Sequence, residues 1–122
     1  MQVTTLYRTL FFSALGTIMA LALLPLSFDG TLLAHDKINH TAAFLLLSWL
    51  FFLAFDALLK SERVMLLFCI AEAIEIVQYF DPPRSFSLAD LLADALGIAL
   101  IFAADHLYHA LRQNRSLHDL RL

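Results

Sequence analysis

Charged side chains are scarce in this sequence, and apolar residues take their place. Only 16% of the 122 residues are charged, whereas 61% are hydrophobic, and the mean hydropathy is +0.76. A soluble domain of this length is nearer half apolar and covers its surface with charge. The composition therefore argues against a soluble domain and favours a protein whose solvent is lipid.

Basic runs and paired cysteines are also missing. The 8 Lys and Arg are outnumbered by 11 Asp and Glu, and no basic segment exists to follow a phosphate backbone, so we expect no nucleic-acid partner. Cys69 is the only cysteine, which excludes a disulfide or a cysteine metal site, and we expect it to be a small core residue. Without internal repeats or Gly/Ser linkers, residues 1–122 are expected to form a single domain.

Four apolar runs, divided by short polar breaks, predict the fold class. Each run is close to the roughly 20 residues that a helix needs to cross the hydrocarbon. The predicted fold is all-α, an integral membrane bundle of four transmembrane helices. The runs cover residues 6–28, 41–59, 64–80 and 88–111.

Two of the breaks carry specific signals for helix ends. Asp81-Pro82-Pro83 ends the third helix, because proline lacks a backbone N–H and restricts the residue before it. Ser87 and Asp90 predict a capping box at the start of the fourth helix. In that motif Ser87 accepts from a backbone N–H, and Asp90 reaches back to the backbone of Ser87.

The distribution of Lys and Arg predicts the orientation. Six of the 8 cations fall on one side of the predicted membrane, and only Lys37 and Arg84 fall on the other. By the positive-inside rule the first side is cytoplasmic, so both termini of this multi-pass protein are expected inside. The six are Arg8, Lys60, Arg63, Arg112, Arg115 and Arg121.

The first run also fits a cleaved secretory signal peptide. Arg8 precedes the apolar stretch, and Ala20-Leu21-Ala22 has the small residues of a cleavage site. Apolar residues continue through Leu26, so we expect a retained helix instead.

Acidic residues within the apolar runs indicate a site. A carboxylate near the centre of a lone spanning helix costs about 2.5–3.5 kcal/mol, so each needs a partner, a proton or a purpose. The third helix is expected to carry one polar stripe and the fourth another, and because consecutive helices pack antiparallel, the stripes predict a polar pocket that opens outward. The stripes are Glu72, Glu75 and Gln78 on the third helix, and Asp90 and Asp94, leading to Gly97, on the fourth.

The mouth of this pocket is expected to gather charged residues from the two outer loops. Asp36, Lys37 and His40 are expected on the first outer loop, with His40 at or just inside the start of the second helix, and Arg84 on the second loop. Carboxylates, cations and an imidazole together are suited to anion binding or to general acid/base catalysis. The predicted ligand-binding residues are Asp36, Lys37, His40, Glu75, Gln78, Arg84, Asp90 and Asp94.

These residues, in this order, resemble the VanZ-like family of small bacterial membrane proteins, named for a member associated with glycopeptide antibiotic resistance. The resemblance covers residues 36–97 and implies the fold, the site and a multi-pass location in the bacterial inner membrane, but it brings no biochemical activity. The chain has Asp94 where the family usually has Asn, and Ala71, Glu72 and Ala73 where it commonly has a glycine. The matching pieces are Asp36-Lys37-Ile38-Asn39-His40 with Phe44, Glu75-Ile76-Val77-Gln78, Pro83-Arg84, and Asp90-Leu91-Leu92-Ala93-Asp94-Ala95-Leu96-Gly97.

The preferred function at this stage is binding, in a resistance-type membrane factor. The pocket is expected to hold the anionic head of a lipid-linked or amphiphilic envelope molecule, contacted by Lys37, Arg84 and protonated His40. The partner is then a membrane lipid or a lipid-linked envelope precursor, and no cofactor is expected. Neither Gly16 nor Gly97 belongs to a Gly-x-x-x-Gly pair, so the sequence does not predict self-association.

Two alternatives stay open. In the first, the protein is a membrane-embedded hydrolase or transferase acting on a lipid headgroup, with catalytic candidates His40, Glu75 and Asp90. His40 is then the acid or base, and a divalent cation is needed between the carboxylates and a phosphate. In the second and weaker alternative, Glu72, Glu75 and Asp94 form a proton relay.

Polar residues near the inner end are expected to make only local pairs. Asp56 and Lys60 are four residues apart, as are Asp105 and His109, which is the spacing of neighbours on one helix face. We predict no metal site there, since no third ligand is evident and metal sites generally use three or more.

Overall fold

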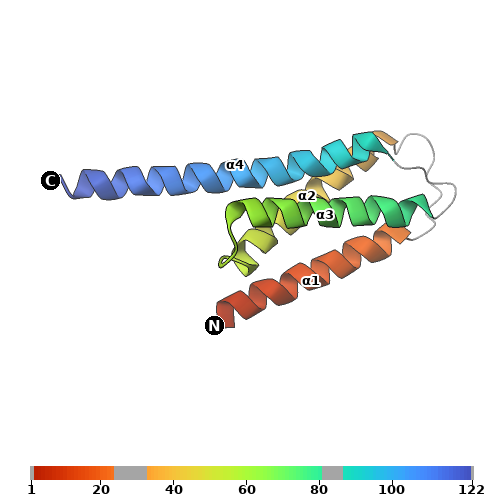
Figure 1. Cartoon of the computed structure of the whole chain (residues 1–122), viewed down its shortest axis with the longest axis horizontal. Coiled ribbons are helices and arrows are strands. Elements are labelled where there is room, and N and C mark those ends of the chain that lie inside the picture. Colours follow the sequence, from red (N-terminus) through yellow and green to blue (C-terminus); the bar gives the residue numbers. More distant parts are fainter. Residues whose placement is uncertain (1, 24–32, 81–86, 122) are drawn as a thin grey trace.

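The described residues fold into four helices. The computed structural model describes residues 2–23, 33–80 and 87–121, with only the backbone described for 33–36. The helices are α1 (Gln2–Leu23), α2 (Leu33–Ala54), α3 (Lys60–Tyr79) and α4 (Leu88–Asp119), and the described residues include no strand. The first residues of α1, the turn between α2 and α3, and the last residues of α4 lie toward one end (Figure 1). The predicted all-α fold with four helices is confirmed.

The helix boundaries differ from the predicted runs where polar residues are helical. α2 begins at Leu33 rather than at residue 41, so the polar Lys37 and His40 lie within its first turns. α3 ends at Tyr79, just before the Asp-Pro-Pro segment, as predicted. α4 continues to Asp119 rather than ending at residue 111, so its polar last residues are also helical. The end of the first predicted run, residues 24–28, lies outside the described residues.

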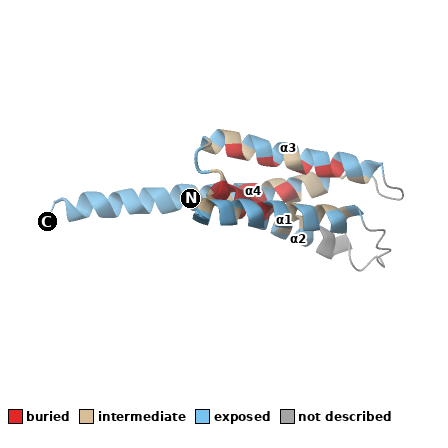
Figure 2. Ribbon diagram, turned by 90° about the horizontal axis from the view of Figure 1, so that it is seen from below, coloured by how far each residue is buried: buried red, intermediate tan, exposed pale blue. Residues whose placement is uncertain are grey.

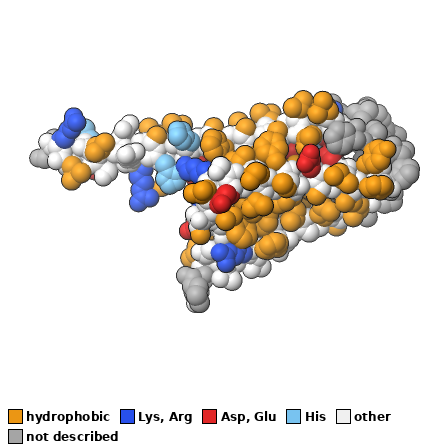
Figure 3. Space-filling model, in the orientation of Figure 1, with side chains coloured by type: hydrophobic (Ala, Val, Ile, Leu, Met, Phe, Trp, Pro, Cys, Tyr) orange, Lys and Arg blue, Asp and Glu red, His pale blue; other side chains and the backbone are white. Residues whose placement is uncertain are grey.

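The second half of α4 projects beyond the other helices. Residues 106–121 are all exposed, and Figure 2 shows this segment uniformly exposed while buried residues gather inside the bundle. Lys, Arg and His side chains are concentrated on the projecting segment, whereas hydrophobic side chains cover most of the visible bundle face (Figure 3). The charge-poor bundle and the charged extension therefore suit different solvents.

Large apolar side chains cover the outside of the bundle. α1 buries only Phe11, and Trp49 of α2 and Leu92 of α4 are more than half exposed. Cys69 is exposed on α3, so its predicted place in the core is wrong. Such a surface is unfavourable in water but is what a helix presents to lipid.

Two helices are long and apolar enough to cross a membrane. Among the described residues these are Gln2–Leu23 and Lys37–Ala54. α3 and α4 are less apolar along their length and carry acidic residues, including the buried Glu75 and Asp94. Membrane-helix character is thus present in two helices, while the four-span topology and the cytoplasmic termini stay predictions.

A close crossing of α2 and α4 fixes the centre of the fold. A Cβ added to Gly97 would lie 2.6 Å from the backbone oxygen of Thr41 and 2.8 Å from the backbone nitrogen of Leu45, so only glycine fits there. The Thr41 hydroxyl donates to the Ala93 carbonyl of α4 at 3.1 Å. Small residues at a crossing let helix backbones approach closely. This contact sets how residues one turn away on α2 and α4 face each other.

Lys60 and Arg63, two cations of the predicted cytoplasmic side, tie the helices together at the end of the bundle where α2 turns into α3. Lys60 pairs with Asp105 of α4, with 2.7 Å between Nζ and Oδ2, rather than with Asp56 as predicted. The predicted pair of Asp105 and His109 is confirmed at 3.4 Å. Arg63 is buried, and its guanidinium donates to backbone carbonyls at the end of α2 and in the turn that follows.

Candidate functional site

A polar cluster lies near the bundle end where α2 begins, α3 ends and α4 begins. Its central members are His40, Glu75 and Asp94, one from each of these helices. At a rise of 1.5 Å per residue, all three lie about 6–10 Å along their helix from its end at this side of the bundle. The antiparallel packing of α3 and α4 brings the two carboxylates to a similar depth.

The shortest contact in the cluster joins α2 to α4. His40 Nδ1 and Asp94 Oδ1 are 2.9 Å apart, a hydrogen bond in which the imidazole N–H donates when Asp94 is ionised. The Asp94 side chain is 0% exposed and that of His40 is 14% exposed. A histidine oriented by a buried carboxylate is a group that can hold or transfer a proton.

Glu75 brings a second carboxylate to the same imidazole from α3. Its Oε1 lies 4.0 Å from His40 Nδ1, and its side chain is 2% exposed. The Oε1 atom has no hydrogen-bond partner among the described residues. Glu75 therefore points into the bundle, and one of its oxygens faces the imidazole without a close donor.

The other oxygen of Glu75 takes part in the start of α4. Ser87 Oγ accepts from the Asp90 backbone N–H at 3.3 Å, as the capping box predicted. The Ser87 backbone N–H, however, donates to Glu75 Oε2 at 3.4 Å. The prediction that Asp90 accepts a hydrogen bond from the Ser87 backbone N–H is wrong, because the Glu75 carboxylate of α3 accepts it instead.

A second polar layer lies one helical turn nearer the bundle end. Lys37 precedes His40 by three residues on α2, and Asp90 precedes Asp94 by four on α4. Lys37 Nζ and Asp90 Oδ1 are 3.9 Å apart, and the side chains are 53% and 14% exposed. Lys37 is thus a partly neutralised cation at the rim of the buried cluster.

The remaining predicted site residues are not all part of this cluster. Gln78 is half-buried one turn beyond Glu75, whereas Glu72 is exposed, so the stripe on α3 does not act as one unit. Residues three apart on a helix are rotated by about 60° from each other, which allows Glu75 to face inward and Glu72 outward. Arg84 and the side chain of Asp36 lie outside the described residues.

A shallow apolar groove runs along α2 and α4 beside the polar cluster. Its volume is about 640 Å³, and Lys37 lies among its lining residues as the only charged one. Sequence reasoning missed this groove, because the residues that line it are ordinary lipid-facing ones until the helices are packed. The lining residues are Lys37, Ile38, Thr41, Ala42, Leu45, Ala89, Leu92, Ala93 and Leu96.

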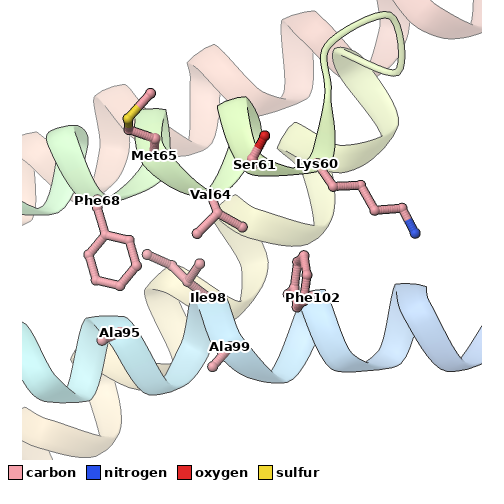
Figure 4. A pocket seen from close by; sticks show the side chains of 9 residues that line it. All are labelled: Lys60, Ser61, Val64, Met65, Phe68, Ala95, Ile98, Ala99 and Phe102. Atoms are coloured by element: carbon pink, nitrogen blue, oxygen red, sulfur yellow. The ribbon is translucent and has the colours of Figure 1, made fainter.

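A second groove of about 620 Å³ lies between α3 and α4 nearer the opposite end. Figure 4 shows Phe68 and Met65 of α3 above Ala95 and Ala99 of α4, with Lys60 at one end. Lys60 is paired with Asp105, so its charge is already balanced. This groove contains none of the predicted site residues.

Comparison with known proteins supports the family that the motifs suggested. The model of the VanZ/LLP1 family matches residues 3–109, which is most of the chain and includes every predicted site residue. Searches of curated proteins and of solved structures found no match. With its apolar helices and this family match, the chain is a membrane protein that belongs to the VanZ/LLP1 family.

Proposed function

We propose that this chain binds the anionic head of a lipid-linked or amphiphilic envelope molecule at the outward-facing end of the bundle. In this proposal it is a multi-pass protein of the bacterial inner membrane and contributes to resistance against glycopeptide antibiotics. The observation that carries the proposal is the position of Lys37, which belongs both to the polar rim and to the apolar groove of α2 and α4. An amphiphile needs these two environments side by side.

Each part of the site has a task in this binding mode. Lys37 contacts the anion, and Asp90 at 3.9 Å holds the lysine at the rim when the site is empty. The groove receives the acyl or prenyl chain, because its lining apart from Lys37 and Thr41 is hydrophobic. Arg84 is proposed as a second anion contact from the outer loop.

The test compares lipid binding by the purified full-length protein and its variants. The probes are phosphatidylglycerol and a polyprenyl phosphate in phosphatidylcholine nanodiscs, quantified by native mass spectrometry. Lys37→Gln is expected to lower the retained amount of both probes about tenfold, which corresponds to losing one charge-assisted contact. Arg115→Gln, on the exposed part of α4, is the matched control and leaves retention unchanged.

A second pair of variants tests the groove rather than the charge. Ala42→Phe fills the groove, whereas Ala73→Phe places the same side chain on the exposed face of α3. Only Ala42→Phe is expected to displace the probes. Equal retention in Lys37→Gln and Arg115→Gln, or in the two phenylalanine variants, refutes the proposal.

In cells, Lys37→Gln and Arg84→Gln should fail to complement the envelope phenotype of a deletion strain.

The alternative is a hydrolase or transferase acting on a lipid headgroup, and the pair of His40 and Asp94 favours it. A buried carboxylate 2.9 Å from Nδ1 fixes the orientation of the ring, as is typical of a catalytic acid or base. The test is release of phosphate from a polyprenyl diphosphate with Mg²⁺, Mn²⁺ or Zn²⁺ present. Turnover that is abolished by His40→Gln supports this function, and no turnover with any ion rules it out.

A further inference from the structure

The buried cluster contains a carboxylate oxygen without a close donor. Glu75 and Asp94 are almost fully buried, and each has an oxygen within 4.0 Å of His40 Nδ1. Glu75 Oε1 has no hydrogen-bond partner among the described residues, although buried polar atoms nearly always have one. An ion that lies between these three side chains gives this oxygen a partner.

The geometry points to a divalent metal site formed by His40 Nδ1, Glu75 Oε1 and a carboxylate oxygen of Asp94, occupied by Zn²⁺ or Mn²⁺. A divalent cation there gives Glu75 Oε1 a positively charged partner, and such a contact is strongest where water is excluded. In the metal-bound form the imidazole proton resides on Nε2, since Nδ1 is the ligand.

The spacing of the three groups suits a metal ion. One ligand atom from each residue can be chosen so that all lie within 4.8 Å of one another. In tetrahedral geometry, metal–ligand distances of about 2.0–2.2 Å place the ligand atoms about 3.3–3.6 Å apart, so a gap of 4.8 Å closes by about 1.2–1.5 Å when the metal binds.

The ligand types narrow the choice of metal. Mg²⁺ and Ca²⁺ prefer oxygen ligands throughout, whereas imidazole is a good ligand for Zn²⁺ and is accepted by Mn²⁺. Three protein ligands leave at least one coordination position for water or for an oxygen of a bound molecule. The inference does not depend on the proposed lipid binding, because the metal alone is the probe in its test.

The experiment measures metal binding by the full-length protein in detergent, without a histidine tag and after removal of metals with a chelator. ZnCl₂ or MnCl₂ is added, and bound metal is counted by mass spectrometry after dialysis. About one ion per chain is expected, with the affinity lowered by at least about 100-fold in Glu75→Gln and Asp94→Asn, since loss of an outer-shell partner alone already costs about 10- to 100-fold. Glu72→Gln is the matched control, because it makes the same change on the exposed face of α3.

A second measurement uses the unmodified protein and does not depend on whether a variant folds. In ¹⁵N-histidine NMR spectra, Zn²⁺ should shift the signal assigned to His40 through His40→Gln and leave the other histidines unchanged. Binding through the exposed histidines of α4 would instead be lost in a variant that carries His106→Gln, His109→Gln and His118→Gln together. Metal content that is equal in Glu75→Gln and Glu72→Gln, or an unshifted His40 signal, overturns the site.

Discussion

At the scale of single residues, the buried Arg63 binds the backbone carbonyls that lie between the end of α2 and the start of α3. Its Nη2 donates to the carbonyls of Asp56 and Leu58 at 2.8 Å, and its Nη1 donates to that of Phe52 at 3.3 Å. The guanidinium also stacks over the Phe52 ring, with 5.1 Å from Cζ to the ring centroid. These carbonyls have no helical partner of their own, so the arginine satisfies groups that would otherwise be buried without a donor.

We expect Arg63→Lys to lower the free energy of unfolding by about 1–3 kcal/mol, because one ammonium cannot reach all these carbonyls as a planar guanidinium does. The measurement is unfolding of the purified protein in mixed detergent micelles, followed by circular dichroism. Arg115→Lys makes the same exchange at an exposed position and should leave stability unchanged. Equal stability of the two variants would show that the carbonyls find other donors.

At the scale of helices, the crossing of α2 and α4 decides where the site residues point. Gly97 lies in backbone contact with Thr41 and Leu45, while His40 and Asp94 lie one residue before Thr41 and three before Gly97. A shift of either helix at this crossing would separate Nδ1 from Oδ1. The sterically required glycine is therefore also what positions the site.

Gly97→Ala is expected to cost about 1–3 kcal/mol of stability, because the added methyl group meets backbone atoms that cannot rotate away. Gly16→Ala is the control, since a Cβ there meets nothing within 4 Å and alanine favours the helix by up to about 1 kcal/mol. Thermal unfolding in detergent distinguishes the two. Destabilisation in Gly16→Ala, or none in Gly97→Ala, would contradict a close crossing.

At the scale of the whole molecule, the arrangement of charge predicts the orientation in the membrane. The first residues of α1, the turn containing Lys60 and the projecting part of α4 lie toward one end (Figure 1), and most Lys and Arg lie there too. The polar cluster and Lys37 lie toward the other end. The positive-inside rule then predicts an outward-facing site.

Labelling of single cysteines in bacterial spheroplasts tests this orientation. In a Cys69→Ser background, Asn39→Cys on exposed α2 should react with a membrane-impermeant maleimide before lysis. Ser116→Cys on the projecting part of α4 should react only after lysis. The reverse pattern would place the site in the cytoplasm and remove the basis for an envelope ligand.

The amino-acid sequence by itself determined the class of protein and its helices. Apolar length, the Asp-Pro-Pro stop and the Ser87 cap act over neighbouring residues, so they can be read before folding. The energetic penalty on a carboxylate in an apolar run likewise identified Glu75 and Asp94 as residues that need a partner.

Only the tertiary structure decided which partners these residues have. His40 meets Asp94 across 54 positions, Lys60 pairs with Asp105 instead of the nearby Asp56, and Glu72 faces outward although it shares a stripe with Glu75. Helical periodicity fixes the direction of each side chain relative to its helix. Residues three apart differ by only about 60°, so which of them points into the bundle depends on which helices touch. The packing of the helices decides which face each side chain takes. The decisive position is Gly97, where α4 has no side chain to keep α2 away.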